Sequence, residues 1–261
     1  MGQRRFGRFN WLGTWTLIKR ETLRFLIVWT QTLLAPVVTA GLFLAIFTLA
    51  IGPGRAGVMG VPFANFLMPG ILMMTVIQNA FANTSSSIVI AKVQGNIVDT
   101  LMPPLSAGEL VTGYIVGGVL RGLVVAGTIA FLMWLVLGQG IAHPAWGLAF
   151  VVTGSTLLGA LGIVAAIFAN KFDQMAAITN FIVTPLSFLS GTFYSIEALP
   201  PALQTVTRLN PVFYLIDGGR YGILGVSDSA PWLGLIVCLG TTIAVLALCW
   251  YWFRIGYRLK A

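Results

Sequence analysis

The stretch GLVVAGTIAFLMWLVLGQGIAHPAWGLAFVVTGSTLLGALGIVAAIFAN, residues 122–170, contains 49 residues without one Asp, Glu, Lys or Arg. A membrane-spanning helix needs about 20 predominantly apolar residues, so this stretch is long enough for two. Gly138, Gly140, His143 and Pro144 interrupt it near its middle, where a turn between helices is expected. We therefore predict two spans here, over about 115–137 and 145–169.

Four further charge-free stretches have the length of a span, because a charge near the bilayer centre costs roughly 2.5–3.5 kcal/mol. The whole chain of 261 residues is 57% hydrophobic and only 8% charged, more apolar than one soluble core can bury. We predict an all-α integral membrane protein with a single transmembrane domain, residues 1–261. We predict six spans in all, and the other four lie at about 25–51, 64–91, 175–193 and 231–253.

Basic residues give the chain a formal net charge of +8, with 15 Lys and Arg against 7 Asp and Glu. They cluster beside apolar runs and at the two ends, which favours a topological role over nucleic-acid binding. Both termini are predicted to be cytoplasmic, because the other side would hold only Arg55, Arg208 and Arg220. The cytoplasmic side would hold Arg4, Arg5, Arg8, Lys19, Arg20, Arg24, Lys92, Lys171, Arg254, Arg258 and Lys260, with Arg121 at a span edge.

The first 24 residues are polar and basic, and are predicted to form an amphipathic helix on the cytoplasmic surface. Asn10 is a suitable cap, and one face of the helix carries Trp11, Trp15, Ile18, Thr22 and Phe25. A simple basic anchor explains the charges equally well, although it explains the tryptophan spacing less well.

Two connections are longer than a helical hairpin requires. Residues 92–109, KVQGNIVDTLMPPLSAGE, contain a short helix-compatible piece around 96–102 that two prolines stop. Residues 194–230 alternate short apolar pieces with prolines and glycines, which indicates interfacial or re-entrant helices on the external side.

Residues that could support catalysis are scarce. His143 is the only histidine, and the seven carboxylates are scattered, so we expect no metal site and no coupling to an ion through an intramembrane acid. No lysine follows a glycine, which excludes the phosphate loop GxxxxGK[ST]. The chain is therefore predicted to be no enzyme and to carry no cofactor.

Polar residues recur at helical spacing in the second and fifth spans, as Thr75, Asn79, Asn83 and Ser86, and as Asn180, Thr184, Ser187 and Gly191. They are consistent with a path for a partly polar substrate, or with hydrogen bonds between helices. Two GxxxG pairs in the third span, Gly113 with Gly117 and Gly118 with Gly122, predict close helix packing. Arg121 beside them is expected near water on a protruding helix, the alternative being a buried partner of a carboxylate.

Three segments together resemble the ABC-2 type permease family, the membrane subunits of bacterial exporters for drugs, polysaccharides, nodulation factors and lipids. They are FLMPGILMM at 66–74, QGNIVDTLMPPLSAGE at 94–109 and GTFYSIEALPPALQTVTRLNPVFYLIDGGRYG at 191–222. The resemblance covers nearly the whole chain. Family members often carry a basic residue before the glycine of the second segment, where this chain has Gln94.

The resemblance implies a half-transporter with the fold of the type V exporters, in the bacterial inner membrane. Two copies would pair with two separate ATPase subunits, which would bind ATP and Mg. The short helix between the second and third spans would dock on the ATPase, with Trp11 and Trp15 beside it. This implies a coupling element made of Gly95, Asn96, Ile97, Val98, Asp99, Leu101 and Met102.

By the same resemblance, the second and fifth spans of the two copies would line a central path for an amphipathic substrate such as a lipid, a lipid-linked glycan or a hydrophobic drug. Candidate contacts with substrate or with the other copy are Thr75, Asn79, Asn83, Asn180, Thr184 and Ser187. An external gate would contain Phe193, Tyr194, Leu199 and Pro200. Asp217 and Arg220, at i and i+3, would hold that external segment by an ion pair.

Two other classes of protein compete with this hypothesis. A secondary transporter or channel would work without ATP, yet the halves show no convincing repeat and the long cytoplasmic segment would have no purpose. An intramembrane enzyme should carry clustered acids or histidines at an interface, which this chain lacks.

Overall fold

The computed structural model describes residues 9–50 and 57–258. Over these ranges the protein is all-helical, as predicted, and an isolated bridge between Val58 and Val61 is the nearest approach to a β-structure. Some residues with a predicted role lie outside these ranges, namely residue 51 at the end of the first expected span and the basic residues Arg4, Arg5, Arg8, Arg55 and Lys260.

Five helical segments among the described residues are long and apolar enough to cross a membrane. The expected fifth span instead consists of three shorter, consecutive pieces, α7 (Phe172–Ile178), the π-helical η3 (Thr179–Val183) and α8 (Thr184–Phe188). The chain is thus a multi-pass helical protein, and the six-span count stays a prediction. The five long segments are η1 with α2 (Thr30–Leu34 and Ala35–Ala50), α3 (Phe63–Val93), α5 (Ala107–Leu137), α6 (Pro144–Phe168) and α11 (Pro231–Ile255).

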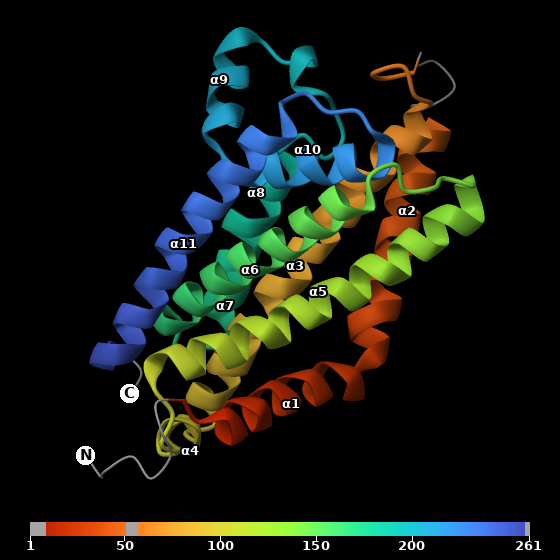
Figure 1. Ribbon diagram of the computed structural model, residues 1–261. Coiled ribbons are helices and arrows are strands. Elements are labelled where there is room, and N and C mark those ends of the chain that lie inside the picture. The colour runs from red at the N-terminus through yellow and green to blue at the C-terminus, as the bar shows by residue number, and fades with distance from the viewer. Residues whose placement is uncertain (1–8, 51–56, 259–261) are drawn as a thin grey trace.

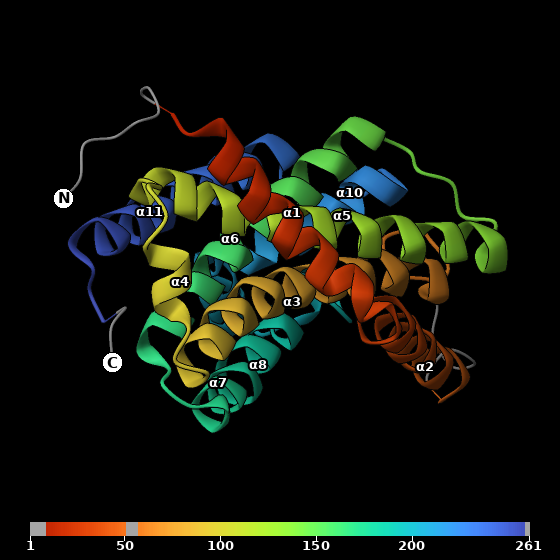
Figure 2. The same cartoon turned by 90° about the horizontal axis from the view of Figure 1, so that it is seen from below.

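The core of the bundle is the pair α3 and α6, which pack along their lengths and are flanked by α5 and α11 (Figure 1). Helix α2 stands at the edge of the bundle (Figure 2). At one end lie α1 (Trp11–Ile27), α4 (Ile97–Leu101) and the end of α11 (Figure 1). At the opposite end lie a single 3-10 turn η4 (Ile196–Ala198), α9 (Pro201–Leu209) and α10 (Pro211–Leu224).

Local sequence signals account for several helix boundaries. The Asn10 side chain accepts a hydrogen bond from the Gly13 amide at 2.9 Å, so it caps α1 as expected. Gly138 ends α5 in the left-handed conformation with φ +62°, and Pro144 begins α6, which confirms the turn predicted inside the longest apolar stretch. Helix α5 starts at Ala107, earlier than the expected 115, because Ser106 and Glu109 form a reciprocal capping box.

Glycines on α5 bring three other helices close to it. A methyl group at Gly113 would collide with Leu17, and one at Gly117 would lie 2.5 Å from Cβ of Glu21, so these two positions seat α1. A methyl group at Gly118 would meet Thr84 of α3 at 3.2 Å, and one at Gly122 would collide with Ser155 of α6. The close packing predicted from the two GxxxG pairs is confirmed.

Replacing Gly117 with Val is therefore expected to push α1 away from α5 and to cost roughly 1–3 kcal/mol, the usual penalty for overpacking a tight contact. The matched control is Gly127→Val on the same helix, where an added Cβ meets nothing within 4 Å. Thermal unfolding in detergent measures the difference, with a thiol-reactive dye reporting exposure of Cys238 and Cys249, which are free and buried. Equal unfolding midpoints for the two variants would contradict this account of the α1 contact.

Candidate functional site

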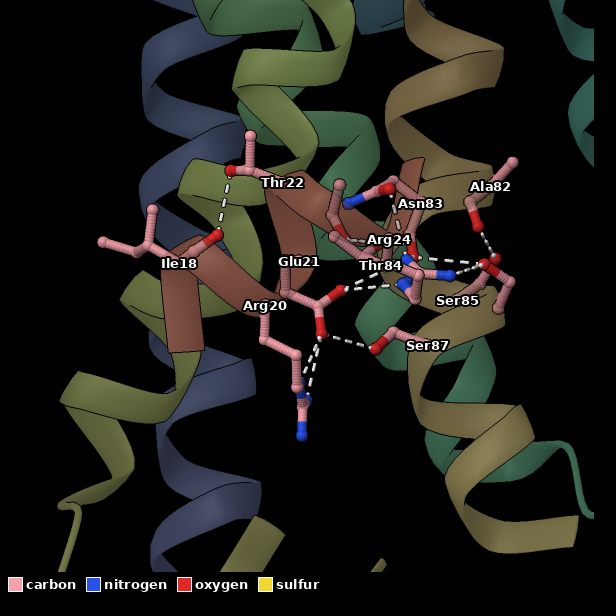
Figure 3. A network of polar contacts seen from close by, with 12 residues as sticks. Ile18, Arg20, Glu21, Thr22, Arg24, Ala82, Asn83, Thr84, Ser85 and Ser87 are labelled. Atoms are coloured by element: carbon pink, nitrogen blue, oxygen red, sulfur yellow. Dashed lines mark hydrogen bonds and ion pairs between the residues drawn. The ribbon is translucent and has the colours of Figure 1, made fainter. Parts of the chain in front are cut away.

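A buried acid on α1 is the centre of a polar network at the end of the bundle where α4 lies (Figure 3). The Glu21 side chain has 0% exposure, and its Oε1 accepts a hydrogen bond from the Ser87 hydroxyl of α3 at 2.8 Å. Arg20 and Arg24 form ion pairs with the two carboxylate oxygens at 3.0 and 3.1 Å. Glu21 therefore ties α1 to the polar side of α3.

The two arginines extend this network to other elements. Arg24 donates to the Ser86 hydroxyl at 3.0 Å, and to the carbonyl and side-chain oxygens of Asn83 at 2.6 and 3.2 Å. Arg20 donates to the Thr100 hydroxyl of α4 at 3.0 Å. Burial alone would lower the pKa of Arg20, but Tyr114 and Glu21 more than offset it, and the pKa is raised. The network thus joins α1, α3 and α4.

Helix α4 is the short helix that the sequence predicted before the two prolines. Its inward residues are Ile97 and Thr100, whereas Val98 is 42% exposed and Met102, which follows the helix, is 76% exposed. Gly95 precedes α4 with φ +73°, a conformation that glycine adopts without strain. The remaining predicted coupling residues, Asn96, Asp99 and Leu101, are exposed or half-buried around the same turn.

The face of α1 that packs against the bundle lies apart from the two predicted tryptophans. Thr14, Leu17, Glu21 and Phe25 are buried, so Phe25 belongs to the inward face. The two tryptophans point away from the bundle, and the exposed fractions are 76% for Trp11 and 64% for Trp15. The inward face is the one that meets the glycines of α5, and the amphipathic surface role of α1 stays a prediction.

Most of the polar stripe on α3 makes contacts inside the chain. Asn83 and Ser86 contact Arg24, and the Asn79 side-chain oxygen accepts from Nε and Nη2 of Arg121 at 3.2 and 2.9 Å. Thr75 bonds only to its own helix, at the Ile71 carbonyl. These contacts match the interhelical interpretation of the stripe. The partner of Arg121 is an amide and not the carboxylate considered as one alternative, and its placement near water stays a prediction.

The second stripe lies on η3 and α8. Asn180 is exposed, Thr184 is half-buried, and Ser187 is buried with its hydroxyl on the Val183 carbonyl at 2.8 Å. Phe181 and Ile182 beside Asn180 are 80% and 59% exposed. This segment therefore presents one outward face of mixed character, and its role in a path or an interface stays a prediction.

A second charged cluster fixes the opposite end of the bundle. The Arg220 side chain has 0% exposure and the Asp217 side chain 1%, and the expected ion pair between them is present at 3.5 Å. Arg220 also lies 3.7 Å from Asp228, donates to the Gly191 carbonyl, and sits over the Phe66 ring at 4.2 Å. The cluster thus binds α10 to α3 and to two loops.

Asp217 holds the loop that leads to α11. Its carboxylate accepts hydrogen bonds from the Asp228 and Ser229 amides at 2.8 and 2.9 Å, and from the Ser229 hydroxyl at 2.6 Å. Burial raises the pKa of the Asp217 carboxyl above its ordinary value, whereas these hydrogen bonds and the charge of Arg220 oppose the rise.

The residues predicted to form an external gate lie in different surroundings. The Phe193 ring stacks on Phe47 of α2 with centroids 4.6 Å apart, and also contacts Phe188 at 5.6 Å. The Tyr194 hydroxyl donates to the Leu189 carbonyl at 2.7 Å. Leu199 is half-buried and Pro200 is exposed at the start of α9. These contacts form an aromatic cluster at α2 and α8, and the role of these residues in a gate stays a prediction.

Several partners in these networks were not among the sequence candidates, namely Glu21, Ser87, Thr100 and Asp228. Glu21 carried a signal, because it shares a helix face with Thr14 and Leu17, but an acid beside two arginines is also typical of a solvated surface. No group of three or more metal-binding side chains occurs in the part of the chain that the structure describes.

Comparison with known proteins gives consistent matches. The family model described as ABC-2 type transporter matches residues 13–224. The chain is similar to "Inner membrane transport permease YadH" of Escherichia coli strain K12, with 35% identity over 252 residues, covering 96% of this chain and 98% of that protein. It is also similar to "Nodulation protein J" of Rhizobium leguminosarum bv. viciae, with 26% identity over 234 residues and 84% of each chain covered.

Proposed function

The chain belongs to the ABC-2 type transporter family, and on this premise we propose that it is the permease subunit of an ATP-driven exporter whose ATPase is a separate protein. The absence of the sequence GxxxxGK[ST] from the chain supports this division of labour. The name of its relative YadH, an inner membrane transport permease, supports an inner-membrane location and a transport role.

One observation carries the proposal most directly: a short helix at the end of the bundle exposes two apolar side chains, one on the helix and one directly after it. Val98 and Met102 are exposed there, whereas Thr100 is hydrogen-bonded to Arg20. Apolar side chains on a small protruding element mark a surface for a protein partner. We assign this surface to the ATPase, with the exposed Trp11 and Trp15 anchoring α1 in the membrane interface.

The mechanism we propose is mechanical. ATP favours the closed arrangement of the two ATPase subunits. The permease has two conformations, and one of them binds the closed ATPases more tightly than the other does. ATP binding therefore shifts the permease toward that conformation. The network from Thr100 through Arg20 and Glu21 to Ser87 offers a contiguous route from α4 to α3. No covalent chemistry takes place on this chain.

We further propose a homodimer with six spans per copy, both termini in the cytoplasm, and two ATPase subunits. The outward face of η3 and α8, with Asn180, Phe181 and Ile182, is the surface we assign to the path or the second copy. The substrate is an amphipathic molecule, because polar groups on an apolar bundle suit a cargo with both characters.

Purification of the tagged chain in mild detergent, with mass determination of whatever accompanies it, tests the assembly. A soluble subunit that carries GxxxxGK[ST], in equal ratio to this chain, is the expected partner. Recovery of the chain alone, under conditions that preserve other complexes of the same membrane, would contradict the proposal and favour an ATP-independent carrier.

Changing Val98 and Met102 together to Asp is expected to release the ATPase without unfolding the permease, because both side chains are exposed. Two charges in an apolar docking surface should lower the amount of copurifying ATPase at least about tenfold, since desolvating an unpaired charge is costly. The control is Val206→Asp at the opposite end, where the valine is 64% exposed. Undiminished copurification with the double variant would rule out this surface as the docking site.

A further inference from the structure

Arg121 lies near the middle of helix α5 and contacts α3. Helices α3 and α5 each contain 31 residues, about 46 Å, and Asn79 and Arg121 are each one residue from the centre of their helix. The contact between their side chains lies one helical turn from Asn83 and Gly117, where α1 packs against both helices. A half-buried arginine within an apolar bundle is costly unless it is paired, so it is expected to have a function.

The charge of Arg121 has no acidic partner among the described residues. Its guanidinium donates from Nε and Nη2 to a single neutral acceptor, the Asn79 side-chain oxygen. The charged residue that acts on it electrostatically is Arg24, which is also positive. Both Arg121 and Asn79 are partly exposed, so the remaining guanidinium donors are open to a further ligand.

A second group nearby has a donor without an acceptor. Asn83 is fully buried, and its side-chain nitrogen has no hydrogen-bond partner. Asn83 lies one turn from Asn79 on α3. Its side-chain nitrogen also faces Gly117 of α5, because a Cβ added at that glycine would lie 3.5 Å from it. Gly117 is one turn from Arg121 on α5. A donor of Asn83 without a partner therefore lies about 6 Å along α3 from the contact between Asn79 and Arg121.

We propose that Arg121 and Asn79 form an intramembrane binding site for the anionic oxygen headgroup of an amphiphile, of the phosphate class. Arginine presents its donors as a planar fork that matches phosphate oxygens, and the bonds are strengthened by charge. The apolar surface of the surrounding helices suits the hydrocarbon part of the molecule. The site rests on the proposed transport function and defines its cargo more narrowly.

Binding is tested with the purified full-length chain in an uncharged detergent. The probe is dihexanoyl phosphatidic acid, with dihexanoylglycerol as its neutral counterpart and inorganic phosphate as the free anion. A ligand that binds the folded state raises the unfolding midpoint in a concentration-dependent manner, from which an apparent affinity follows. We expect stabilisation by phosphatidic acid, none by dihexanoylglycerol, and much weaker binding of inorganic phosphate.

Two variants separate ligand binding from structural support. Arg121→Gln removes the charge and should weaken phosphatidic acid binding at least about tenfold, the loss of one charge-assisted hydrogen bond. Asn79→Asp places a carboxylate on the same guanidinium, so it should keep or raise the unfolding midpoint without ligand and still weaken binding about tenfold. Arg208→Gln, an exposed arginine on α9, is the control and should bind as the parent protein does.

Parent-like affinity for phosphatidic acid in either Arg121→Gln or Asn79→Asp would overturn the site. Binding of inorganic phosphate as tightly as phosphatidic acid would overturn the assignment of an amphiphile. Neither result depends on ATP or on a partner subunit. Failure of the exporter proposal would instead appear as a missing ATPase in the copurification experiment, so the two failures are distinguishable.

Discussion

Replacing Asp217 with Asn should lower the unfolding midpoint of the chain by roughly 10 °C, the largest stability loss that we expect from one substitution. The Arg220 side chain is fully buried, and its charge is balanced by Asp217 at 3.5 Å and Asp228 at 3.7 Å. Removing one partner of a buried ion pair costs roughly 3–5 kcal/mol, and each kcal/mol lowers the midpoint of a protein this size by about 2–4 °C.

Two further variants serve as controls for this substitution. Asp173→Asn makes the same chemical change at an exposed position of α7 and should leave the midpoint unchanged. Combining Asp217→Asn with Arg220→Met removes both charges, and the double variant should be more stable than the single one, because an apolar replacement of a whole pair is often tolerated. A parent-like midpoint for Asp217→Asn alone would show that the cluster does not anchor α10.

Patterns confined to one segment were the reliable part of the sequence prediction. The apolar runs located α3, α5, α6 and α11, and the turn between α5 and α6 is marked by Gly138 and Pro144, as expected. The ion pair of Asp217 with Arg220 was also visible, because i and i+3 positions meet on any helix. The expected fifth span was less regular than its composition suggested, since η3 interrupts it with a π-helical turn.

Contacts between distant segments were not predictable in the same way. The inward face of α1 depends on Gly113 and Gly117, which lie about a hundred residues away in sequence. Asp228 and Glu21 have their roles because the fold brings them to Arg220 and Ser87. From the sequence we expected either water or a carboxylate beside Arg121. In the structure its guanidinium donates to the side-chain oxygen of Asn79. Spacing identifies a polar residue, but the partner is decided by helix packing.

Replacing Glu21 with Gln is expected to uncouple ATP hydrolysis from movement of the permease while the complex stays assembled. The substitution removes the charge that holds Arg20 and Arg24, which link α1 to α4 and α3. A hydrogen bond to a charged group contributes roughly 1.5–3 kcal/mol. The loss should stay within this range, because the Arg20 and Arg24 side chains are 47% and 29% exposed and water can replace part of the interaction.

The measurement follows a fluorescent label at the far end of the bundle, on Leu209→Cys of α9, where the side chain is 80% exposed. In the parent complex, ATP should change the fluorescence of this label. With Glu21→Gln the ATPase should still copurify and hydrolyse ATP, but the response should be lost. Glu197→Gln, an exposed acid on η4, is the matched control and should keep it.

A second substitution decides whether the charge of Glu21 or merely its volume is needed. Arg24→Gln removes the opposite charge, so combining it with Glu21→Gln leaves no unpaired Arg24 in the network. If the ion pair transmits the movement, both single variants and the double variant lose the response, although the double variant regains part of the lost unfolding midpoint. A full ATP response in Glu21→Gln would instead assign Glu21 to the docking of α1 alone, and the route from α4 to α3 would have to pass through other contacts.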